Sequence, residues 1–240
     1  MHISKVQINK ESFPVKDQYP FHLPVLENIN EIQFKTPITF FIGENGCGKS
    51  TLLRAMALNA GIYIWQGIQR TRYDNNPYEN DLYKYIDITW NDGKVTGSYF
   101  GAQHFYNFSQ LIDEWSALDN GVLNYFGGKA LGSQSHGQSI LSYFKARYHK
   151  KGIYFLDEPE TALSPASQIE FIKLLHKINQ GSGIQMFIAT HSPLLPACPG
   201  ADIYQFSDQG ITELSYHDMQ YMQIYKSFLN DPVGYLGLES

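Results

Sequence analysis

The sequence predicts an α/β fold in which a mixed central sheet lies between layers of helices. Three runs of residues are apolar almost throughout and have the length of a strand, namely 38–42, 152–156 and 184–189. Such runs are typical of parallel strands that are buried on both faces. Segments with helical periodicity come between the runs, as expected for strands that alternate with helices.

A glycine-rich loop follows the first run. Residues 43–51, GENGCGKST, match the phosphate-binding pattern G-x-x-x-x-G-K-[ST], and apolar residues at helical spacing follow until Gly61. Glycines leave room for backbone N–H groups around a phosphate chain, and the helix N-terminus adds a positive dipole end. Because a strand and a helix flank the loop, a chance match in a glycine-rich turn is the weaker interpretation. The residues expected to bind a nucleotide are Gly43, Asn45, Gly46, Cys47, Gly48, Lys49, Ser50 and Thr51, with Lys49 on the outer phosphates and Ser50 on Mg²⁺.

The second run ends in two adjacent carboxylates. Asp157 and Glu158 follow it directly, and Pro159 comes next. Ligands of open α/β sheets bind at the carboxyl ends of the strands. We therefore expect Asp157 to hold Mg²⁺, directly or through water, and Glu158 to polarise the water that attacks the γ-phosphate. An ordinary strand that ends in a polar turn is the alternative, and the phosphate loop upstream argues against it.

The third run ends just before His191, which is followed by Ser192 and Pro193. A histidine at this place can contact the γ-phosphate and orient the catalytic water or Glu158. Most single histidines are ordinary surface or core groups, so the prediction for His191 depends on its position at the end of a strand.

A further helix is predicted after Ser135, which suits the N-cap position. Apolar residues on one face support this helix, namely Ile140, Leu141, Phe144 and Tyr148. The Ser135 hydroxyl and the N–H group of Gly137 would form an anion site at the helix N-terminus. A plain helix cap explains the same residues equally well.

The order of these motifs resembles the ATP-binding cassette (ABC) class of ATPases, and especially its soluble branch near the SMC and RecF proteins. Four segments carry the likeness. Val6–Phe13 is similar to the first strand and turn of these proteins, and 135–138 (SHGQ) is similar to the signature motif. Ala162–Ser164 resembles the D-loop, and His191 resembles the switch histidine. His136 replaces the middle glycine of the usual signature L-S-G-G-Q, a departure that argues against transporter subunits.

The resemblance implies an ATP hydrolase that needs Mg²⁺ and works as a dimer around ATP, with Ser135 and Gly137 on the γ-phosphate held by the other subunit. It also implies a glutamine at Mg²⁺. The candidates are Gln66, Gln69, Gln103 and Gln110. Gln103 is favoured because residues 95–102 read as a strand that leads to it, although an exposed loop glutamine fits as well. Tyr19 or Phe21 is expected to stack on adenine, unless either packs in the core.

The 240 residues are enough for one ABC-type ATPase domain. Its predicted parts are a β-rich part with the phosphate loop (1–61), a small inserted lobe (62–130) and a part with the signature, the carboxylates and the switch histidine (131–240). The sequence contains no sustained heptads, so the long coiled-coil arm of SMC proteins is not expected.

Composition limits the partners. The formal net charge of −5 gives no general positive field, so direct nucleic-acid binding is possible but unsupported by charge. No apolar run approaches the roughly 20 residues that span a bilayer, and the first residues lack the apolar region of a secretory signal. The two cysteines, Cys47 and Cys198, give no disulfide framework, which favours a cytoplasmic location.

Together these features predict an ABC-type ATPase that acts as a homodimer around ATP or in a complex with an effector chain. Hydrolysis would drive or time the action of that partner, in DNA repair or anti-phage defence. The alternative is the nucleotide-binding subunit of a membrane transporter.

Overall fold

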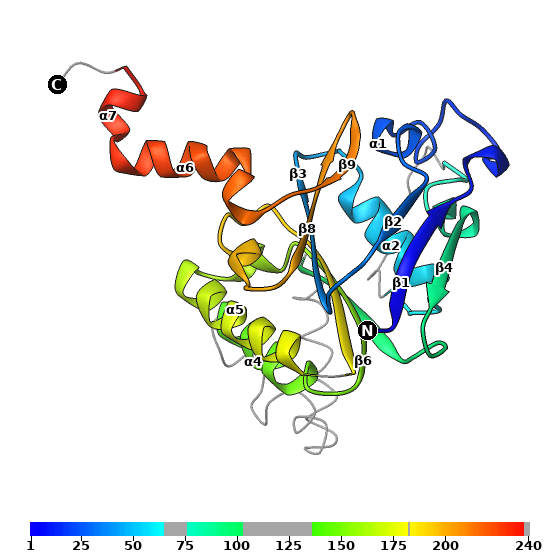
Figure 1. The fold of residues 1–240 in the computed structure, drawn as a ribbon, viewed down its shortest axis with the longest axis horizontal. Coiled ribbons are helices and arrows are strands. Elements are labelled where there is room, and N and C mark those ends of the chain that lie inside the picture. Colours follow the sequence, from blue (N-terminus) through cyan, green and yellow to red (C-terminus); the bar gives the residue numbers. More distant parts are fainter. Residues whose placement is uncertain (65–75, 103–135, 182, 238–240) are drawn as a thin grey trace.

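The computed structural model describes residues 1–64, 76–102, 136–181 and 183–237. A six-stranded sheet in the order β5-β6-β7-β3-β8-β9 runs through the centre of the molecule (Figure 1). Its neighbouring strands are parallel except β8 and β9, which form an antiparallel hairpin. The mixed central sheet predicted from the sequence is therefore confirmed. The strands are β3 (Ile38–Gly43), β5 (Gly97–Gly101), β6 (Gly152–Asp157), β7 (Ile184–Ala189), β8 (Asp202–Ser207) and β9 (Gly210–Glu213).

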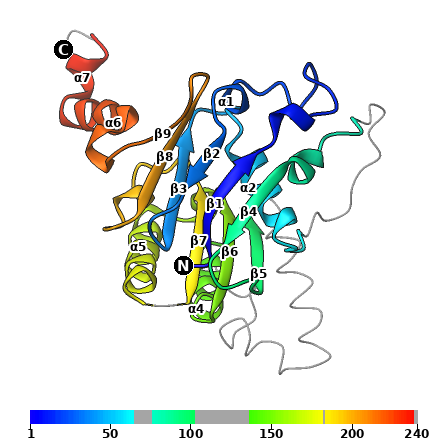
Figure 2. The same cartoon turned by 45° about the vertical axis from the view of Figure 1, so that its right-hand side comes forward.

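A smaller antiparallel sheet has the order β2-β1-β4, and Figure 2 shows β1 and β4 side by side. Its strands are β1 (Ile3–Ile8), β2 (Glu31–Gln33) and β4 (Ile86–Trp90). Both β4 and β5 come from the segment 62–130, which was expected to form an inserted lobe. Because β4 pairs with β1 and β5 pairs with β6, these two strands belong to sheets shared with the rest of the chain. The sequence predicted a strand over residues 95–102, and β5 confirms it. Strand β4 was not predicted: its apolar residues alternate with exposed Asp87 and Thr89, so it lacks a continuous apolar run.

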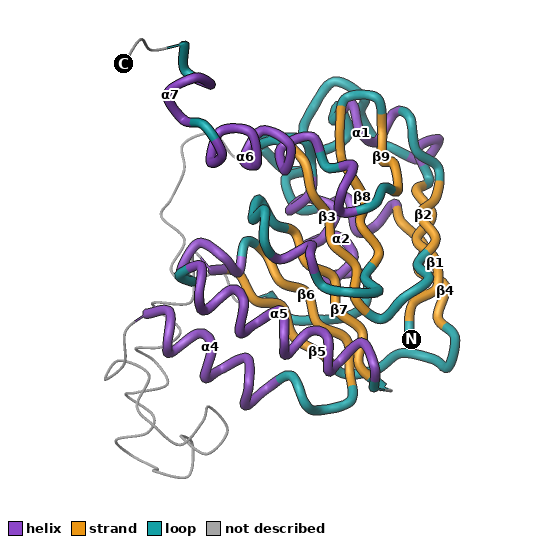
Figure 3. Tube along the Cα trace, turned by 60° about the vertical axis from the view of Figure 1, so that its left-hand side comes forward, coloured by secondary structure: helices purple, strands orange, loops and turns teal. Residues whose placement is uncertain are grey.

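Helices cover both faces of the central sheet. Helix α2 (Lys49–Asn59) lies between the two sheets, and α4 (His136–Arg147) and α5 (Pro165–Gln180) lie on the opposite face (Figure 3). Helices α6 (Gln220–Asn230) and α7 (Pro232–Tyr235) extend away from the sheets near the C-terminus (Figure 1). Short helical segments complete the described fold: α1 (Pro24–Glu27) and the 3₁₀ turns Lys10–Ser12, Asp81–Tyr85, Pro159–Ala162, Leu195–Ala197 and Tyr216–Asp218.

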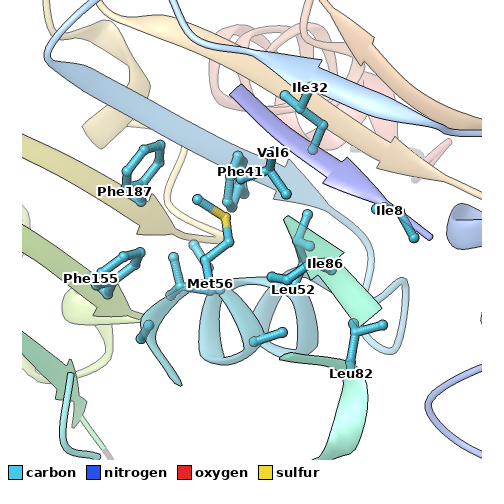
Figure 4. Close-up of a cluster of buried hydrophobic side chains, with 14 of the residues drawn as sticks. Val6, Ile8, Ile32, Phe41, Leu52, Met56, Leu82, Ile86, Phe155 and Phe187 are labelled. Carbon is cyan, nitrogen blue, oxygen red and sulfur yellow. The ribbon is translucent and has the colours of Figure 1, made fainter. Parts of the chain in front are cut away.

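Two hydrophobic clusters lie on the two faces of the central sheet, and β3 contributes to both. Phe41 packs with Met56 of α2 in the first cluster (Figure 4), whereas Phe40 and Ile42 point into the second. All three side chains are at most 1% exposed. Burial on both faces explains why this strand is apolar throughout, and each such side chain contributes about 1.5–3 kcal/mol.

The sequence predicts a helix that Ser164 caps and Pro165 begins, with Ile169, Ile172, Leu175 and Ile178 facing inward. Helix α5 confirms the start of this helix but not the position of Ile169. Ser164 caps the helix, since its Oγ accepts a hydrogen bond from Ser167 N over 3.2 Å, and Pro165 is the first helical residue. Ile169 was expected to face inward but is 48% exposed, and Phe171 is fully buried. At 3.6 residues per turn these two positions lie on opposite sides of a helix. Phe171, rather than Ile169, therefore lies on the buried face of α5.

Candidate active site

The ends of four strands bring the predicted site residues to one edge of the sheet. In the register of β3 and β7, Phe41 lies beside Ala189. Ala189 in turn lies beside Asp157 of β6, and Asp157 lies beside Gly101 of β5. The phosphate loop after β3, the carboxylates at the end of β6 and His191 after β7 therefore start from the same level of the sheet.

All three glycines of the phosphate loop have positive φ angles, and two of them show most clearly why glycine is needed. Gly43 has φ +142°, and a Cβ atom there would lie 2.4 Å from the carbonyl oxygen of Phe206. Gly48 precedes α2 with φ +97°, a left-handed conformation that other residues adopt only at a cost of roughly 1–2 kcal/mol. Glycines at these places thus let the chain turn sharply from β3 into the N-terminus of α2.

Lys49 is buried inside this turn, with 4% of its surface exposed. Its Nζ donates hydrogen bonds to the carbonyl oxygens of Gly43, over 3.0 Å, and Glu44, over 2.7 Å. The Sγ atom of Cys47 lies 3.6 Å from the same ammonium group. The loop therefore wraps around a fixed positive charge next to the positive end of the α2 dipole, an arrangement suited to anions.

Asp157 is held by two hydroxyl groups. Ser50 Oγ donates to Asp157 Oδ1 over 2.7 Å, and Tyr99 OH donates to Asp157 Oδ2 over 2.8 Å. Burial, and then the charge of Asp157, hold the pKa of Tyr99 well above its usual value, so the phenol remains a donor. Ser50 and Asp157, which were both predicted to lie at Mg²⁺, therefore contact each other, whereas the contact of Tyr99 was not predicted.

Glu158 and His191 face each other, and His191 Nε2 lies 3.8 Å from Glu158 Oε1. About a third of each side chain is exposed, 34% for His191 and 30% for Glu158. Glu158 has φ +49°, so it adopts a left-handed conformation that is uncommon for a residue other than glycine. A hydrogen bond from Glu158 N to Ala189 O, over 2.9 Å, holds this turn against β7. Such backbone outliers cluster at functional sites.

The imidazole of His191 is neutral at neutral pH. Burial and the charge of Lys49 lower its pKa below the usual 6.5, and the charges of Glu158 and Asp157 oppose this effect only in part. A neutral imidazole can donate one hydrogen bond and accept another. It can therefore contact a phosphate oxygen without adding a positive charge to that of Lys49.

Glu160 is a further residue that the sequence did not point to. Its Oε1 accepts a hydrogen bond from the backbone N of His191 over 2.6 Å. Burial raises the pKa of this carboxyl group, more than the hydrogen bond from His191 lowers it. The residue lies two positions after Glu158, in the turn Pro159–Ala162.

A pocket of about 220 Å³ opens beside these groups and is lined by Ser50, Arg54, Tyr99, Asp157 and Glu158. Tyr19 also lines it, is 36% exposed and is joined through its OH to Thr51 Oγ1 at 2.9 Å. Phe21 is only 3% exposed and packs against Tyr85. Of the two aromatic candidates for adenine, Tyr19 is therefore the accessible one.

Some predicted site residues are not tested by the structure. Gln103 and Ser135 lie outside the described residues, as do the other glutamine candidates, Gln66, Gln69 and Gln110. Gly137 lies in the first turn of α4. The parts of the chain that the structure describes contain no cluster of three or more acidic, histidine or cysteine side chains suited to a metal ion.

Comparison with protein families gives two matches, which cover separate parts of the chain. Residues 129–195 match a family described as an AAA ATPase domain, and residues 21–109 match one described as an AAA domain. The first range includes Asp157, Glu158 and His191, and the second includes the phosphate loop. These matches support ATP hydrolysis as the activity of the chain.

Curated relatives are ATP-binding proteins. A probable siderophore transport system ATP-binding protein of Bacillus subtilis is 26% identical over 181 residues, which are 70% of this chain and 66% of the relative. The iron(3+)-hydroxamate import ATP-binding protein of the same organism is 27% identical over 182 residues, which are 70% of this chain and 67% of the relative. The matched parts thus span about two thirds of the length of these relatives.

Solved structures show the same fold at low identity. A chain of an ABC transporter in an inward-facing conformation is 17% identical, with a TM-score of 0.51 over 96% of this chain and 90% of that one. The cbiO1 protein from Clostridium perfringens, part of an ABC transporter complex, is 18% identical, with a TM-score of 0.52 over 97% and 98% of the two chains. The chain therefore has the α/β fold of ABC-type ATPases. Among its described helices, none has the length and apolar character to cross a membrane.

Proposed function

We propose that this chain is an ABC-type ATPase that encloses Mg-ATP between two copies of itself, or between itself and an effector chain, and hydrolyses it to drive or time a partner's action. The observation that carries the proposal is the meeting of Lys49, Ser50, Asp157, Glu158 and His191 at one edge of the sheet, with the contacts given above. A single domain over residues 1–240 and a cytoplasmic location are parts of the same proposal.

In the proposed mechanism Lys49 neutralises charge on the outer phosphates. Its ammonium group now bonds to the carbonyls of Gly43 and Glu44, so the loop itself keeps the charge in place. Because the transferred group carries negative charge throughout the reaction, a fixed cation lowers the barrier by electrostatic stabilisation.

Ser50 and Asp157 fit a Mg²⁺ ion. Their oxygens lie 2.7 Å apart, and Mg²⁺ in phosphate sites takes oxygen ligands from one or two side chains, the phosphates and water. When bound, Mg²⁺ supplies positive charge to the phosphate oxygens. Gln103 is proposed as a further contact of the ion.

Glu158 is proposed to accept a proton from the attacking water, and His191 to contact the γ-phosphate and orient that water. The separation of 3.8 Å between their side chains leaves both within reach of one small group. A neutral His191 does not form an ion pair with Glu158, so the carboxylate stays available to the attacking water.

Ser135 and Gly137 are proposed to close the site of the partner copy, as in the signature motif that residues 135–138 resemble. In Glu158→Gln the chemistry should be slow and Mg-ATP should persist, so the isolated protein should change from monomer to dimer in light scattering. The double variant Glu158→Gln, Ser135→Arg should remain monomeric, because the arginine blocks docking of the γ-phosphate. A double variant that dimerises as well as Glu158→Gln would contradict this role of the signature.

A second candidate function is that of a transporter subunit, because the curated relatives are named as ATP-binding proteins of import systems. The altered signature, with His136 in place of glycine, favours the first proposal. Purification from the native cell in the presence of ATP, followed by mass spectrometry, distinguishes them. A polytopic membrane protein in stoichiometric amount would support the transporter function. A protein without membrane spans in that place would support the effector complex.

A further inference from the structure

The side chain of Glu160 connects the turn after β6 to the backbone after β7. Its Oε1 accepts the hydrogen bond from His191 N over 2.6 Å, between residues 31 positions apart. The mechanism proposed above gives Glu160 no role. It does place two residues at the reacting water: His191, which is one partner in this contact, and Glu158, which lies two positions before Glu160.

The neighbouring amide groups already have other acceptors. Thr190 N donates to Phe41 O over 3.0 Å, and Ser192 N donates to Thr190 Oγ1 over 2.9 Å. The N–H group of His191 between them relies on Glu160. Backbone N–H groups away from water need an acceptor, so loss of this carboxylate would favour another position of the His191 backbone.

The cost of placing a carboxylate here indicates that the contact is useful. Glu160 Oε2 is buried and accepts no well-aligned hydrogen bond among the residues that the structure describes, and only the nearby side chain of Thr190 favours its charged form. Burying a carboxylate that is only half satisfied is unfavourable. An apolar side chain would avoid this cost but could not accept the hydrogen bond from His191.

The backbone of the same turn is also fixed to β7. Glu158 N donates to Ala189 O over 2.9 Å, and Thr161 Oγ1 donates to Glu158 O over 3.0 Å. The turn after β6 therefore fixes the backbone of Glu158, the proposed base. Through the side chain of Glu160 it also holds the backbone of His191.

We infer that Glu160 is a positioning residue: by holding the backbone of His191, it keeps the imidazole 3.8 Å from Glu158 and aimed at the γ-phosphate. The inference rests on the proposed function, because it acts through the role of His191 in ATP hydrolysis. It adds a residue that contacts neither nucleotide nor metal but sets the geometry of the two residues that contact the water.

A double-mutant cycle in kcat tests the inference on the full chain. The variants are Glu160→Ala, Glu160→Gln, His191→Ala and Glu160→Ala with His191→Ala, measured well below the lowest unfolding temperature of the set. Glu160→Ala should lower kcat by about 10- to 100-fold with little change in KM, because small misplacements of a catalytic group have effects of this size. Glu160→Gln should keep most of the activity, since its amide oxygen still accepts the hydrogen bond. The double variant should be no slower than His191→Ala.

Gln168→Leu is the matched control. Gln168 Oε1 accepts a hydrogen bond from Ser192 Oγ over 2.6 Å, so this variant breaks a part-buried contact one residue beyond His191. It should lower the unfolding temperature but leave kcat within about twofold of wild type. If Glu160→Ala does not fold, Glu160→Asp replaces it, because the shorter side chain cannot reach His191 N.

Three results would overturn the inference: wild-type kcat in the folded Glu160→Ala or Glu160→Asp variant, a double variant slowed by the full product of the single effects, or wild-type kcat in His191→Ala. In each case ATP hydrolysis with Glu158 as base would still stand. Two other results would instead contradict the proposed function: a wild-type protein that does not hydrolyse ATP, or a Glu158→Gln variant that hydrolyses ATP at the wild-type rate.

Discussion

The hydroxyl group of Ser50 donates a hydrogen bond of 2.7 Å to Asp157 Oδ1, across 107 positions of sequence. The contact fixes the first turn of α2 to the end of β6. Ser50 directly follows the buried Lys49 in the chain, so the contact also ties the phosphate loop to Asp157. The phosphate loop and the acidic strand end thus form one site.

The first prediction concerns the metal. Asp157→Asn should bind ATP with nearly equal affinity in Mg²⁺ and in EDTA, because the amide removes the negative charge that attracts the ion. Wild type should bind more tightly in Mg²⁺. Isothermal titration calorimetry measures both affinities, and Asp92→Asn, an exposed site, is the control. Full Mg²⁺ dependence in Asp157→Asn would remove this residue from the metal site.

The second prediction concerns Tyr99. Tyr99→Phe removes the donor to Asp157 Oδ2 and so frees one side of the carboxylate. We expect the Mg²⁺ concentration for half-maximal ATPase activity to rise about tenfold, which corresponds to about 1.4 kcal/mol. Tyr154→Phe is the matched control, because that tyrosine donates to Lys150 O over 2.8 Å, remote from the carboxylates. An unchanged Mg²⁺ requirement in Tyr99→Phe would contradict the prediction.

The third prediction concerns pH. Because the pKa of His191 lies below 6.5, kcat should be constant from pH 8 to about pH 6.5. At lower pH it should fall as the imidazole is protonated. The unfolded chain binds this proton at a higher pH than the folded chain, so stability should fall over the same window. The acidic fall in kcat should disappear in His191→Gln. It should persist in Glu160→Gln, which excludes the nearby carboxyl group whose pKa is raised.

The fourth prediction concerns the phosphate loop. Lys49→Ala should lose measurable ATP binding in calorimetry, because it removes the positive charge that faces the phosphates. The fold should be retained, as judged by circular dichroism, since β3 and α2 keep their hydrophobic contacts. Lys173→Ala, a change on the exposed face of α5, is the control. Micromolar affinity for ATP in Lys49→Ala would argue against this loop as the nucleotide site.

The sequence predicted the central strands because burial on two faces leaves a clear pattern. Phe40, Phe41 and Ile42 are all apolar, since consecutive residues of β3 enter opposite clusters. The same pattern put the proposed site residues at the ends of these strands, and their roles stay predictions. The helical stripe of α5 was less clear, because Ile169 is apolar yet 48% exposed, and periodicity alone did not identify the inward face.

Tyr99 and Glu160 were missed because their partners are far away in sequence. Tyr99 reads as an ordinary strand tyrosine until the register of β5 and β6 places it on the same face as Asp157. Glu160 reads as a polar turn residue until the fold brings it to a backbone N–H group 31 positions later. The position of Glu160 so soon after the two adjacent carboxylates is the signal that could have directed attention to it.

The fate of bound ATP in Glu158→Gln tests the central claim most directly. The glutamine keeps the shape of the side chain but cannot take the proton from water, so a single-turnover, rapid-quench measurement should find hydrolysis slowed by about 10²-fold or more. ATP binding should equal that of wild type, because Lys49, Ser50 and Asp157 are unchanged. Glu11→Gln, an exposed site on another element, should hydrolyse at the wild-type rate. Hydrolysis in Glu158→Gln at the wild-type rate would contradict the assignment of Glu158 as the base and, with it, this account of the site.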